Sequence, residues 1–483
     1  MSRLLLEKPF PGATTCVLVG DALALDRTRL QPFRHLLWLT DRDNVQRARP
    51  ILPRHAIQTA FVDDSPAQPA VEQFLRRDPR HLPSVFVSDT VLTQHSDAYR
   101  RALAELHATL ESHHRSRVTR QKDGFAWQKN VLENLTDYAT RRIPAAWAGA
   151  LRGIPAFVCG GSPSLEVSAP KLAPHATHGV VFATDSSLRT LAQHDIPVDF
   201  AVFIDAAKHP DKYLPLASSP ARLVLSPVSP PSWQAALPRA DRLYLSNSQI
   251  TVDWLATQSI PRPPLAVAEN GRATALELAR FLGCAPIYLF GLDLASDAGA
   301  SMYRESGDGP ALDMPHVPGN HAKAVPTLAY GELRALNERL AAWPAGLVIN
   351  VNDRGARLRN TTVVHPDAFT LAPAGAKASR LAALTPIAPL APAVLHAARN
   401  RVRLAATLGR TKAAEIRRTL EHRTPEAAAV ALRQLFSDQT FAHVFGDYSL
   451  KLMPHLVPPI EPDPAPWHAL LDELDELCAL ASR

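Results

Sequence analysis

The sequence predicts an α/β protein built around a doubly wound, mostly parallel sheet. Short apolar runs alternate with helical stretches from about residue 156 to residue 290, the pattern of strands joined by crossover helices. One run, Ala156–Cys159, breaks into a glycine pair and restarts as a helix, and polar residues follow several other runs directly. In such sheets ligands bind outside the carboxyl ends of the strands, where the strand order reverses. The sequence therefore predicts a ligand site at that edge.

Length and composition predict several domains. A chain of 483 residues exceeds what one core holds, and its 46% hydrophobic and 20% charged residues are typical of a globular protein. The predicted division is an N-terminal α/β domain at 1–120, a central α/β domain with the ligand site at 121–370, a Pro/Ala-rich linker at 371–392 and a C-terminal helical domain at 393–483. The linker between the central and C-terminal domains is recognised by its high content of Pro and Ala.

Charge, cysteine usage and hydropathy exclude several protein classes. Lys and Arg number 52 against 46 Asp and Glu, a modest excess that fits an anionic ligand. Basic residues gather in one helical stretch, 399–423, either as a solvated face or as a contact surface for an acidic partner or a membrane. Aromatic residues are not interleaved there, so nucleic acid is not an expected partner. The four cysteines are far apart, and no signal peptide or transmembrane run is recognisable, which predicts free thiols and a cytoplasmic protein.

The elements of the two α/β regions follow from the positions of the apolar runs. Three strands, Cys16–Val19, Leu36–Leu39 and Val85–Val87, and a helix over 99–114 are expected in the first region, and a second helix over 125–153 leads into the central sheet. The central strands are expected at Phe157–Cys159, Val180–Ala183, Phe200–Ile204, Leu223–Leu225, Leu243–Leu245 and Ile287–Phe290. No spacing in the first region suggests catalysis.

The glycine pair is the strongest local signal. Gly160 and Gly161 permit a turn with φ > 0, and Pro163 suits the first turn of the helix that follows. Such a turn aims free N–H groups and the positive end of a helix dipole at one point, which suits a phosphate. Ser162 and Ser164 add hydroxyl donors. The alternative is an ordinary strand-to-helix turn.

Other candidate residues follow later strands or lie in a long loop. Asp185, Ser186, Asp205 and Asp293 come just after apolar runs, where each could instead cap a turn. Asn270 and Gly271 begin a second helix whose N-terminus could also face a ligand. The loop 296–326 is long enough for an active-site loop, and it contains the polar side chains Tyr303, His316 and His321.

Several stretches of the chain, taken in sequence order, resemble the motifs of one protein family. Cys159-Gly-Gly-Ser-Pro-Ser-Leu-Glu166 is similar to the G-x-G-P-S-L motif of the motility accessory factor (Maf) family of flagellin glycosyltransferases, which is related to 6-hydroxymethylpterin pyrophosphokinase-like proteins. The resemblance covers roughly residues 125–365. It continues through Ala183–Arg189, Ile196–Asp205, Asn270–Gly271, Gly283–Ala295 and Val348–Ala356.

The resemblance implies a sialyltransferase-like central domain and a reaction. Proteins of this kind transfer a nonulosonic acid, of pseudaminic or legionaminic type, from a CMP-sugar to Ser or Thr of flagellin, a step in flagellum assembly and motility. Two departures limit the comparison. This chain has Ser162-Pro163-Ser164 where the family usually has Gly-Pro-Ser, and Asn352–Ala356 where it has a Glu-Gly-Gly-Ala-like segment, so an acidic role near 353 is in doubt.

The chemistry of such a transfer assigns provisional roles. The site must bind the nucleotide, neutralise the departing phosphate and activate an acceptor hydroxyl. Gly160, Gly161, Ser162 and Ser164 are the predicted phosphate cradle. The predicted nucleotide and sugar contacts are Asp185, Ser186, Asn270, Gly271 and Tyr303, and the candidate general bases are Asp205, Asp293, His316 and His321. No cofactor or metal ion is required beyond the CMP-sugar itself.

Two other functions remain open at this point. One is an ATP- and Mg²⁺-dependent pterin pyrophosphokinase, and the other is a non-catalytic accessory protein that binds nucleotide sugar or flagellin. A nicotinamide dehydrogenase is disfavoured because no G-x-G-x-x-G follows the first strand of the sheet.

Overall fold

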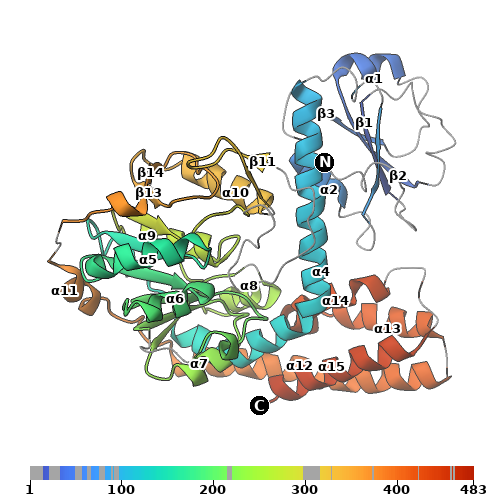
Figure 1. The fold of residues 1–483 in the computed structure, drawn as a ribbon. Coiled ribbons are helices and arrows are strands. Elements are labelled where there is room, and N and C mark those ends of the chain that lie inside the picture. The colour runs from blue at the N-terminus through green and yellow to red at the C-terminus, as the bar shows by residue number, and fades with distance from the viewer. Residues whose placement is uncertain are drawn as a thin grey trace. The chain divides into compact units, whose positions relative to one another are not determined.

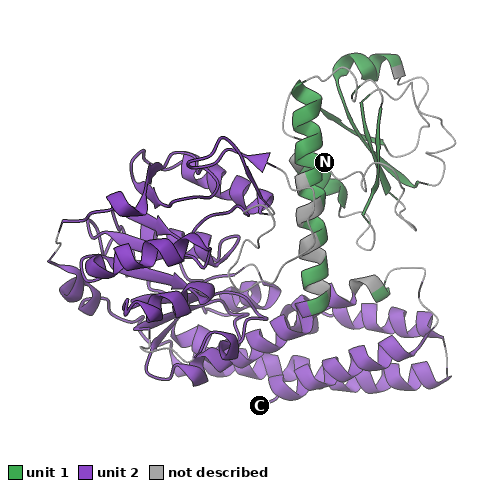
Figure 2. Ribbon diagram, in the orientation of Figure 1, with its two compact units in different colours: residues 1–122, 453–459 green, residues 123–452, 460–483 purple. Residues whose placement is uncertain are grey.

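The computed structural model describes residues 15–20, 33–48, 57–62, 67–75, 82–88, 91, 97–214, 220–247, 249–296, 316–327, 329–372, 375–422, 424–456, 460 and 463–483. The chain divides into two compact units (Figure 2). Unit 1 comprises residues 1–122 and 453–459, and unit 2 comprises residues 123–452 and 460–483.

Unit 1 contains a four-stranded parallel sheet in the order β3-β2-β1-β4. Its elements are β1 (Thr15–Val19), β2 (His35–Thr40), α1 (Arg42–Ala48), β3 (Ile57–Phe61), α2 (Gln68–Leu75) and β4 (Ser84–Val87). The three strands expected from apolar runs are present. The edge strand β3 was not expected, because it is only partly buried and its sequence mixes polar and apolar residues.

A single helix, α4 (Asp97–Thr140), replaces the two helices expected at 99–114 and 125–153. No proline interrupts these 44 residues, and Gly124 alone costs a helix about 1 kcal/mol relative to alanine. The boundary between the units therefore falls within a continuous helix, where composition gives no sign of it.

Unit 2 is centred on an eight-stranded sheet in the order β14-β13-β10-β5-β6-β7-β8-β9, and every pairing in it is parallel (Figure 1). The strands are β5 (Ala156–Cys159), β6 (Val180–Thr184), β7 (Phe200–Phe203), β8 (Arg222–Leu225), β9 (Asp241–Tyr244), β10 (Ile287–Phe290), β13 (Val348–Val351) and β14 (Thr362–Val364). The chain runs outward from β5 to β9 and then returns to add β10, β13 and β14 on the other side of β5. The strand order therefore reverses between β5 and β10.

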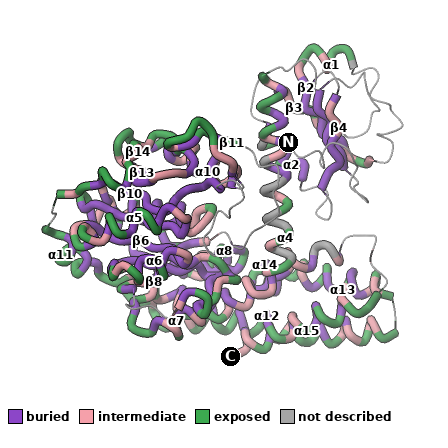
Figure 3. The backbone as a smooth tube through the Cα atoms, viewed as in Figure 1, coloured by how far each residue is buried: buried purple, intermediate pink, exposed green. Residues whose placement is uncertain are grey.

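Helices cover both faces of this sheet. They are α5 (Ser164–Leu172), α6 (Leu188–Gln193), α7 (Ser232–Ala236), α8 (Ile250–Thr257), α9 (Gly271–Phe281) and α10 (Tyr330–Ala341). Val158 and Leu289 share a core with residues of α9 and α10, whereas Phe157 points to the opposite face and contacts the rings of Phe290 and Phe369. The central strands are buried (Figure 3), and because both faces of the sheet are covered their residues are almost wholly apolar. The predicted α/β class with a doubly wound parallel sheet is confirmed.

The C-terminal part is helical and belongs to unit 2. It contains α11 (Lys377–Ala382), α12 (Pro392–His422), α13 (Pro425–Ser437), α14 (Gln439–Leu456) and α15 (Ala465–Ala481). Helix α11 lies in the expected linker, and its Lys377 makes a buried 2.7 Å ion pair with Asp199 beside the sheet. This segment is thus packed against the sheet rather than loosely attached.

The basic residues of α12 have acceptors within unit 2. Arg417 pairs with Asp472 and Asp475 of α15, and Arg399 donates to Thr136 Oγ1 over 2.8 Å. A surface helix with internal partners accounts for this basic run, and contact with an acidic partner or a membrane there stays a prediction. None of the helices among the described residues combines the length and apolar character needed to cross a membrane.

Candidate functional site

The Gly160–Ser164 turn lies at the reversal of strand order, between β5 and α5. Three of its amides already have acceptors. Gly160 N donates to Phe290 O over 2.8 Å, Ser162 N donates to Gly291 O over 3.2 Å, and Ser164 N donates to Asp293 Oδ2 over 3.1 Å. The turn is therefore closed against the loop that follows β10, and a phosphate-binding role for it stays a prediction that these amides do not support.

Close packing, rather than backbone conformation, explains the two glycines. Neither has a positive φ, contrary to the expectation from sequence. A Cβ on Gly160 would lie 2.5 Å from Gly291 O, and a Cβ on Gly161 would lie 2.3 Å from Ser186 Oγ and 2.7 Å from the Ser186 carbonyl carbon. No real Cβ fits at those distances. The glycines let the ends of β5, β6 and β10 approach one another.

Asp293 fills the place where an anion was expected. Its carboxylate accepts hydrogen bonds from the main chain and hydroxyl of Ser164, at the N-terminus of α5, and from Asn352 Nδ2 over 2.9 Å. The side chain is buried, and burial raises the pKa of this carboxyl against the lowering effect of the hydrogen bonds from Ser164 and Asn352. The helix terminus is thus capped by the protein's own carboxylate.

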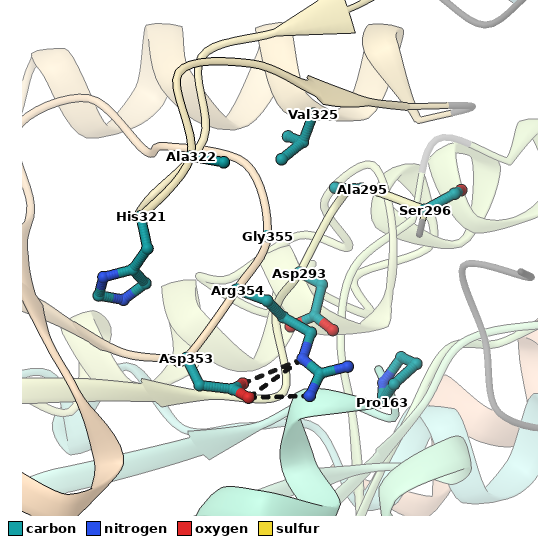
Figure 4. A pocket seen from close by; sticks show the side chains of 10 residues that line it. All are labelled: Pro163, Asp293, Ala295, Ser296, His321, Ala322, Val325, Asp353, Arg354 and Gly355. Carbon is teal, nitrogen blue, oxygen red and sulfur yellow. Dashed lines mark hydrogen bonds and ion pairs between the residues drawn. The ribbon is translucent and has the colours of Figure 1, made fainter. Parts of the chain in front are cut away.

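A pocket of about 250 Å³ opens beside this cap. Its lining comes from the loops after β5, β10 and β13 and from the hairpin of β11 (His316–Val317) and β12 (Val325–Pro326). The pocket therefore lies at the carboxyl ends of the strands at the reversal of strand order, where ligands bind in this architecture. The lining residues are Pro163, Asp293, Ala295, Ser296, His321, Ala322, Val325, Asp353, Arg354 and Gly355 (Figure 4).

The charged side chains of the pocket come mainly from the turn after β13. Arg354 donates to the Asp353 carboxylate through Nε, over 3.1 Å, and through NH2, over 2.8 Å (Figure 4). The side chain of Asp353 is 16% exposed and that of Arg354 is 36% exposed. The pocket therefore offers a guanidinium that is held in place and can still meet solvent or a ligand.

The backbone around the pocket is locally strained. Leu294, between Asp293 and Ala295, has φ +46°, which a leucine rarely adopts. Gly355 has φ +82°, which glycine adopts without strain, and a Cβ there would lie 2.8 Å from Asp293 Cα, so only glycine fits beside the strained Leu294. Strain of this kind persists where the surrounding structure enforces it, and it is concentrated at functional sites.

His321 is the only one of the two predicted histidines that lines the pocket among the described residues. Its Nε2 lies 2.8 Å from the carbonyl oxygen of Asn352. A carbonyl can only accept, so Nε2 carries the proton and Nδ1 is the basic nitrogen of the neutral ring. His321 therefore has an unprotonated Nδ1 in the neutral ring, and the role of general base stays a prediction. His316 lies on β11, is exposed and does not line the pocket.

The other predicted residues among those described do not line the pocket. Asp205 is exposed and accepts from Ala207 N over 2.9 Å, as a turn residue does. Asp185 pairs with Lys208 over 2.9 Å at the end of β6, and Ser186 packs against Gly161. Asn270 caps α9, which begins at Gly271, by accepting from Ala273 N. Tyr303 lies outside the described residues.

Several polar residues of the site were not predicted from sequence. Ser296 Oγ is buried in the pocket wall and has no hydrogen-bond partner among the described residues. Arg272 is buried between Ser162 Oγ, at 3.3 Å, and Glu332 Oε2, at 3.1 Å. Asn352 and Arg354 directly follow the apolar strand β13, so the rule that polar residues after strands meet at one edge would have found them. No group of acidic, histidine or cysteine side chains in the described part of the chain has the arrangement of a metal site.

Comparison with known proteins gives two matches. Residues 129–299 match the family described as 6-hydroxymethylpterin diphosphokinase MptE-like. The whole chain is similar to the solved structure of a Maf glycosyltransferase from Magnetospirillum magneticum AMB-1, with 16% identity, a TM-score of 0.56 and coverage of 97% of this chain and 78% of that one. No functionally curated protein matches. Both matches agree with the resemblance read from the sequence: residues 129–299 are similar to the MptE-like family, and the chain has the fold of a Maf glycosyltransferase.

Proposed function

We propose that this protein is a glycosyltransferase that moves a nonulosonic acid from a CMP-sugar to a Ser or Thr hydroxyl of flagellin in the cytoplasm. The observation that carries the proposal is the pocket at the reversal of strand order, which brings a histidine with a basic Nδ1 and an arginine together in a Maf-like fold. The sugar type, pseudaminic or legionaminic, follows from the family resemblance.

The proposed reaction uses these groups in one displacement. The acceptor hydroxyl oxygen attacks the anomeric carbon and loses its proton to His321 Nδ1. The bond from that carbon to the phosphate oxygen breaks, and CMP leaves with the electron pair. A general base of this kind contributes about 10²–10⁴-fold to the rate.

The charged side chains of the pocket suit the anionic groups of the donor. Arg354 supplies a cation for the sugar carboxylate or the departing phosphate, because guanidinium groups bind both in a bidentate manner. Asp353 holds that guanidinium in place. At about 250 Å³ the pocket is smaller than the usual range of about 300–1,000 Å³ for drug-sized ligands, so it suits one ring of the donor rather than the whole CMP-sugar.

The MptE-like match favours one other candidate, an ATP- and Mg²⁺-dependent pterin pyrophosphokinase. The two functions differ in ligand. A ligand that binds only the native state raises the melting temperature, by an amount that grows with its concentration over Kd. Titration of the purified chain with CMP, with ATP plus Mg²⁺ and with NAD therefore separates them.

The expected result is stabilisation by CMP and not by NAD. Stabilisation by ATP with Mg²⁺ alone would favour the kinase, and no shift with any of the three would favour an accessory protein. The direct test incubates the chain with flagellin and CMP-pseudaminic or CMP-legionaminic acid and records the intact mass of flagellin. Transfer is expected to continue in the presence of EDTA, since the proposed step uses no metal ion.

A further inference from the structure

Asn352 is the junction of the segments that build the pocket. The residue is fully buried directly after β13, and its side chain and main chain both form hydrogen bonds. Nδ2 donates to Asp293 Oδ1 over 2.9 Å, and Oδ1 accepts from Arg354 N over 3.0 Å. The carbonyl oxygen accepts from His321 Nε2 over 2.8 Å. One residue therefore contacts the loop after β10, the turn that carries Arg354 and the hairpin that carries His321.

We propose that Asn352 is the positioning residue that sets the tautomer and location of His321, and does so through its own hydrogen bond to Asp293. The assignment of His321 as the base rests on the proposed function. The control of its tautomer does not, because it depends only on contacts within this chain.

Only a neutral amide satisfies both neighbours of this side chain. Asp293 has no proton to offer and needs a donor, whereas Arg354 N needs an acceptor. An amide provides one of each on adjacent atoms. With Asp293 anchored to α5 through Ser164, the Asn352 side chain fixes the main chain at 352, and with it the carbonyl that selects which ring nitrogen of His321 is protonated.

An aspartate at 352 would have the same shape as the asparagine, but its carboxylate would repel Asp293 instead of donating a hydrogen bond to it. Two carboxylates about 2.9 Å apart cannot both ionise at low cost, so the pair would bind one proton and titrate as a unit. The other titratable and charged groups that face this cluster are Asp353, Arg354, His321 and, through its ring contact with His321, His365. In Asn352→Asp the connection to Asp293 would therefore persist at acidic pH and fail as the pH rises.

The test compares Asn352→Asp with the wild type by nuclear magnetic resonance of protein labelled with ¹⁵N-histidine. His321→Gln identifies the His321 signals among the 19 histidines. The wild type is expected to show the tautomer with the proton on Nε2 at pH 8. At pH 8, where the carboxyl at 352 can no longer share a proton with Asp293, Asn352→Asp is expected to lose this tautomer in favour of a mixture. A wild-type ring with the proton on Nδ1, or a variant with the same single tautomer as the wild type at pH 8, would overturn the proposal.

Asn134→Asp is the matched control. Asn134 is another buried asparagine of unit 2, and its amide donates to Pro227 O and Ser229 O. The same substitution there should lower the melting temperature and leave the His321 signals unchanged. A change at His321 in this control as large as in Asn352→Asp would mean that general destabilisation, not positioning, explains the result.

The rate gives a second readout where transfer is observed. The ratio of kcat for Asn352→Asp to kcat for the wild type should fall at least tenfold as the pH is raised from 5.5 to 8. An equal reduction at every pH would indicate a structural role only. The tautomer is measured without substrate, so a failure of the transfer reaction would overturn the proposed function and leave this inference to be judged on its own.

Discussion

At the scale of single residues, Asp293 shows how burial determines what a carboxylate does. All the hydrogen bonds it accepts come from Ser164 and Asn352, and they use both of its oxygens. Three of the roughly four acceptor positions of the carboxylate are thus occupied by hydrogen bonds from the protein itself. For the proposed reaction we therefore assign Asp293 as the cap of α5 and His321 as the base, although both were candidates from sequence.

Asp293→Asn is expected to destabilise unit 2. An amide Nδ2 would face either Ser164 N, in the place of Oδ2, or both Ser164 Oγ and Asn352 Nδ2, in the place of Oδ1, and leaving buried donors unpaired costs about 1–3 kcal/mol. Urea unfolding should show this loss in the free energy of unfolding. A variant with wild-type stability and no transfer activity would instead restore Asp293 as a catalytic residue.

His321→Gln is expected to separate activity from stability. The glutamine cannot act as a base near neutral pH, so the transfer rate should fall by about 10²–10⁴-fold. The melting temperature should change little, because the ring is exposed and makes one hydrogen bond with the main chain. The matched control is His316→Gln on the same hairpin, which should retain activity. Equal loss in both variants would count against the assignment.

At the scale of elements, one carboxylate of the helical part caps a helix of the sheet part. Asp447 of α14 accepts hydrogen bonds from Ile250 N, Thr251 N and Thr251 Oγ1 at the start of α8. Burial raises the pKa of Asp447, the bonds from residues 250 and 251 lower it, and nearby Asp253 raises it further. The net direction is upward, so the native state binds this proton more tightly than the unfolded state does.

The sign of the resulting pH dependence is fixed. A raised folded pKa contributes stability that is fully present below the unfolded value of about 3.9 and is lost as the pH rises through the folded pKa. Asp447→Asn removes this contribution. The stability of the wild type minus that of the variant, from urea unfolding, should therefore increase as the pH is lowered from 7 to about 4. A difference that shrinks over this range would contradict the raised pKa.

The elements were largely predictable from sequence, and the site was predictable in part. Strands buried on both faces have continuous apolar runs, so β5 to β10 could be located and their order along the chain suggested one edge for the ligand. Hydrogen bonds between distant segments produce no comparable pattern in the local sequence. Ser164 and Asp293 are 129 positions apart, and nothing local in Gly291–Leu294 indicates that the carboxylate caps α5. For the same reason Asn352 could be quoted in a motif without its role being visible.

At the scale of the molecule, the sheet and the C-terminal helices form one compact unit, whereas composition suggested two domains joined by a linker. Buried polar contacts explain the difference. Gln128 of α4 donates to Val444 O over 2.9 Å and accepts from Tyr448 N over 3.2 Å, while Asp447 caps α8. Each contact satisfies a group that would otherwise be buried without a partner, so neither part is complete alone.

Cooperative unfolding of unit 2 follows from these contacts. A chain ending at residue 392 would leave Gln128 and Thr251 without their acceptors on α14 and would expose the apolar surfaces that α14 covers. We expect that fragment to be poorly soluble, and a fragment of residues 123–483 to unfold in a single transition by calorimetry. If the chain ending at 392 instead melted at the temperature of the full-length protein, the sheet would be an independent domain. The helices would then be free to serve acceptor binding alone.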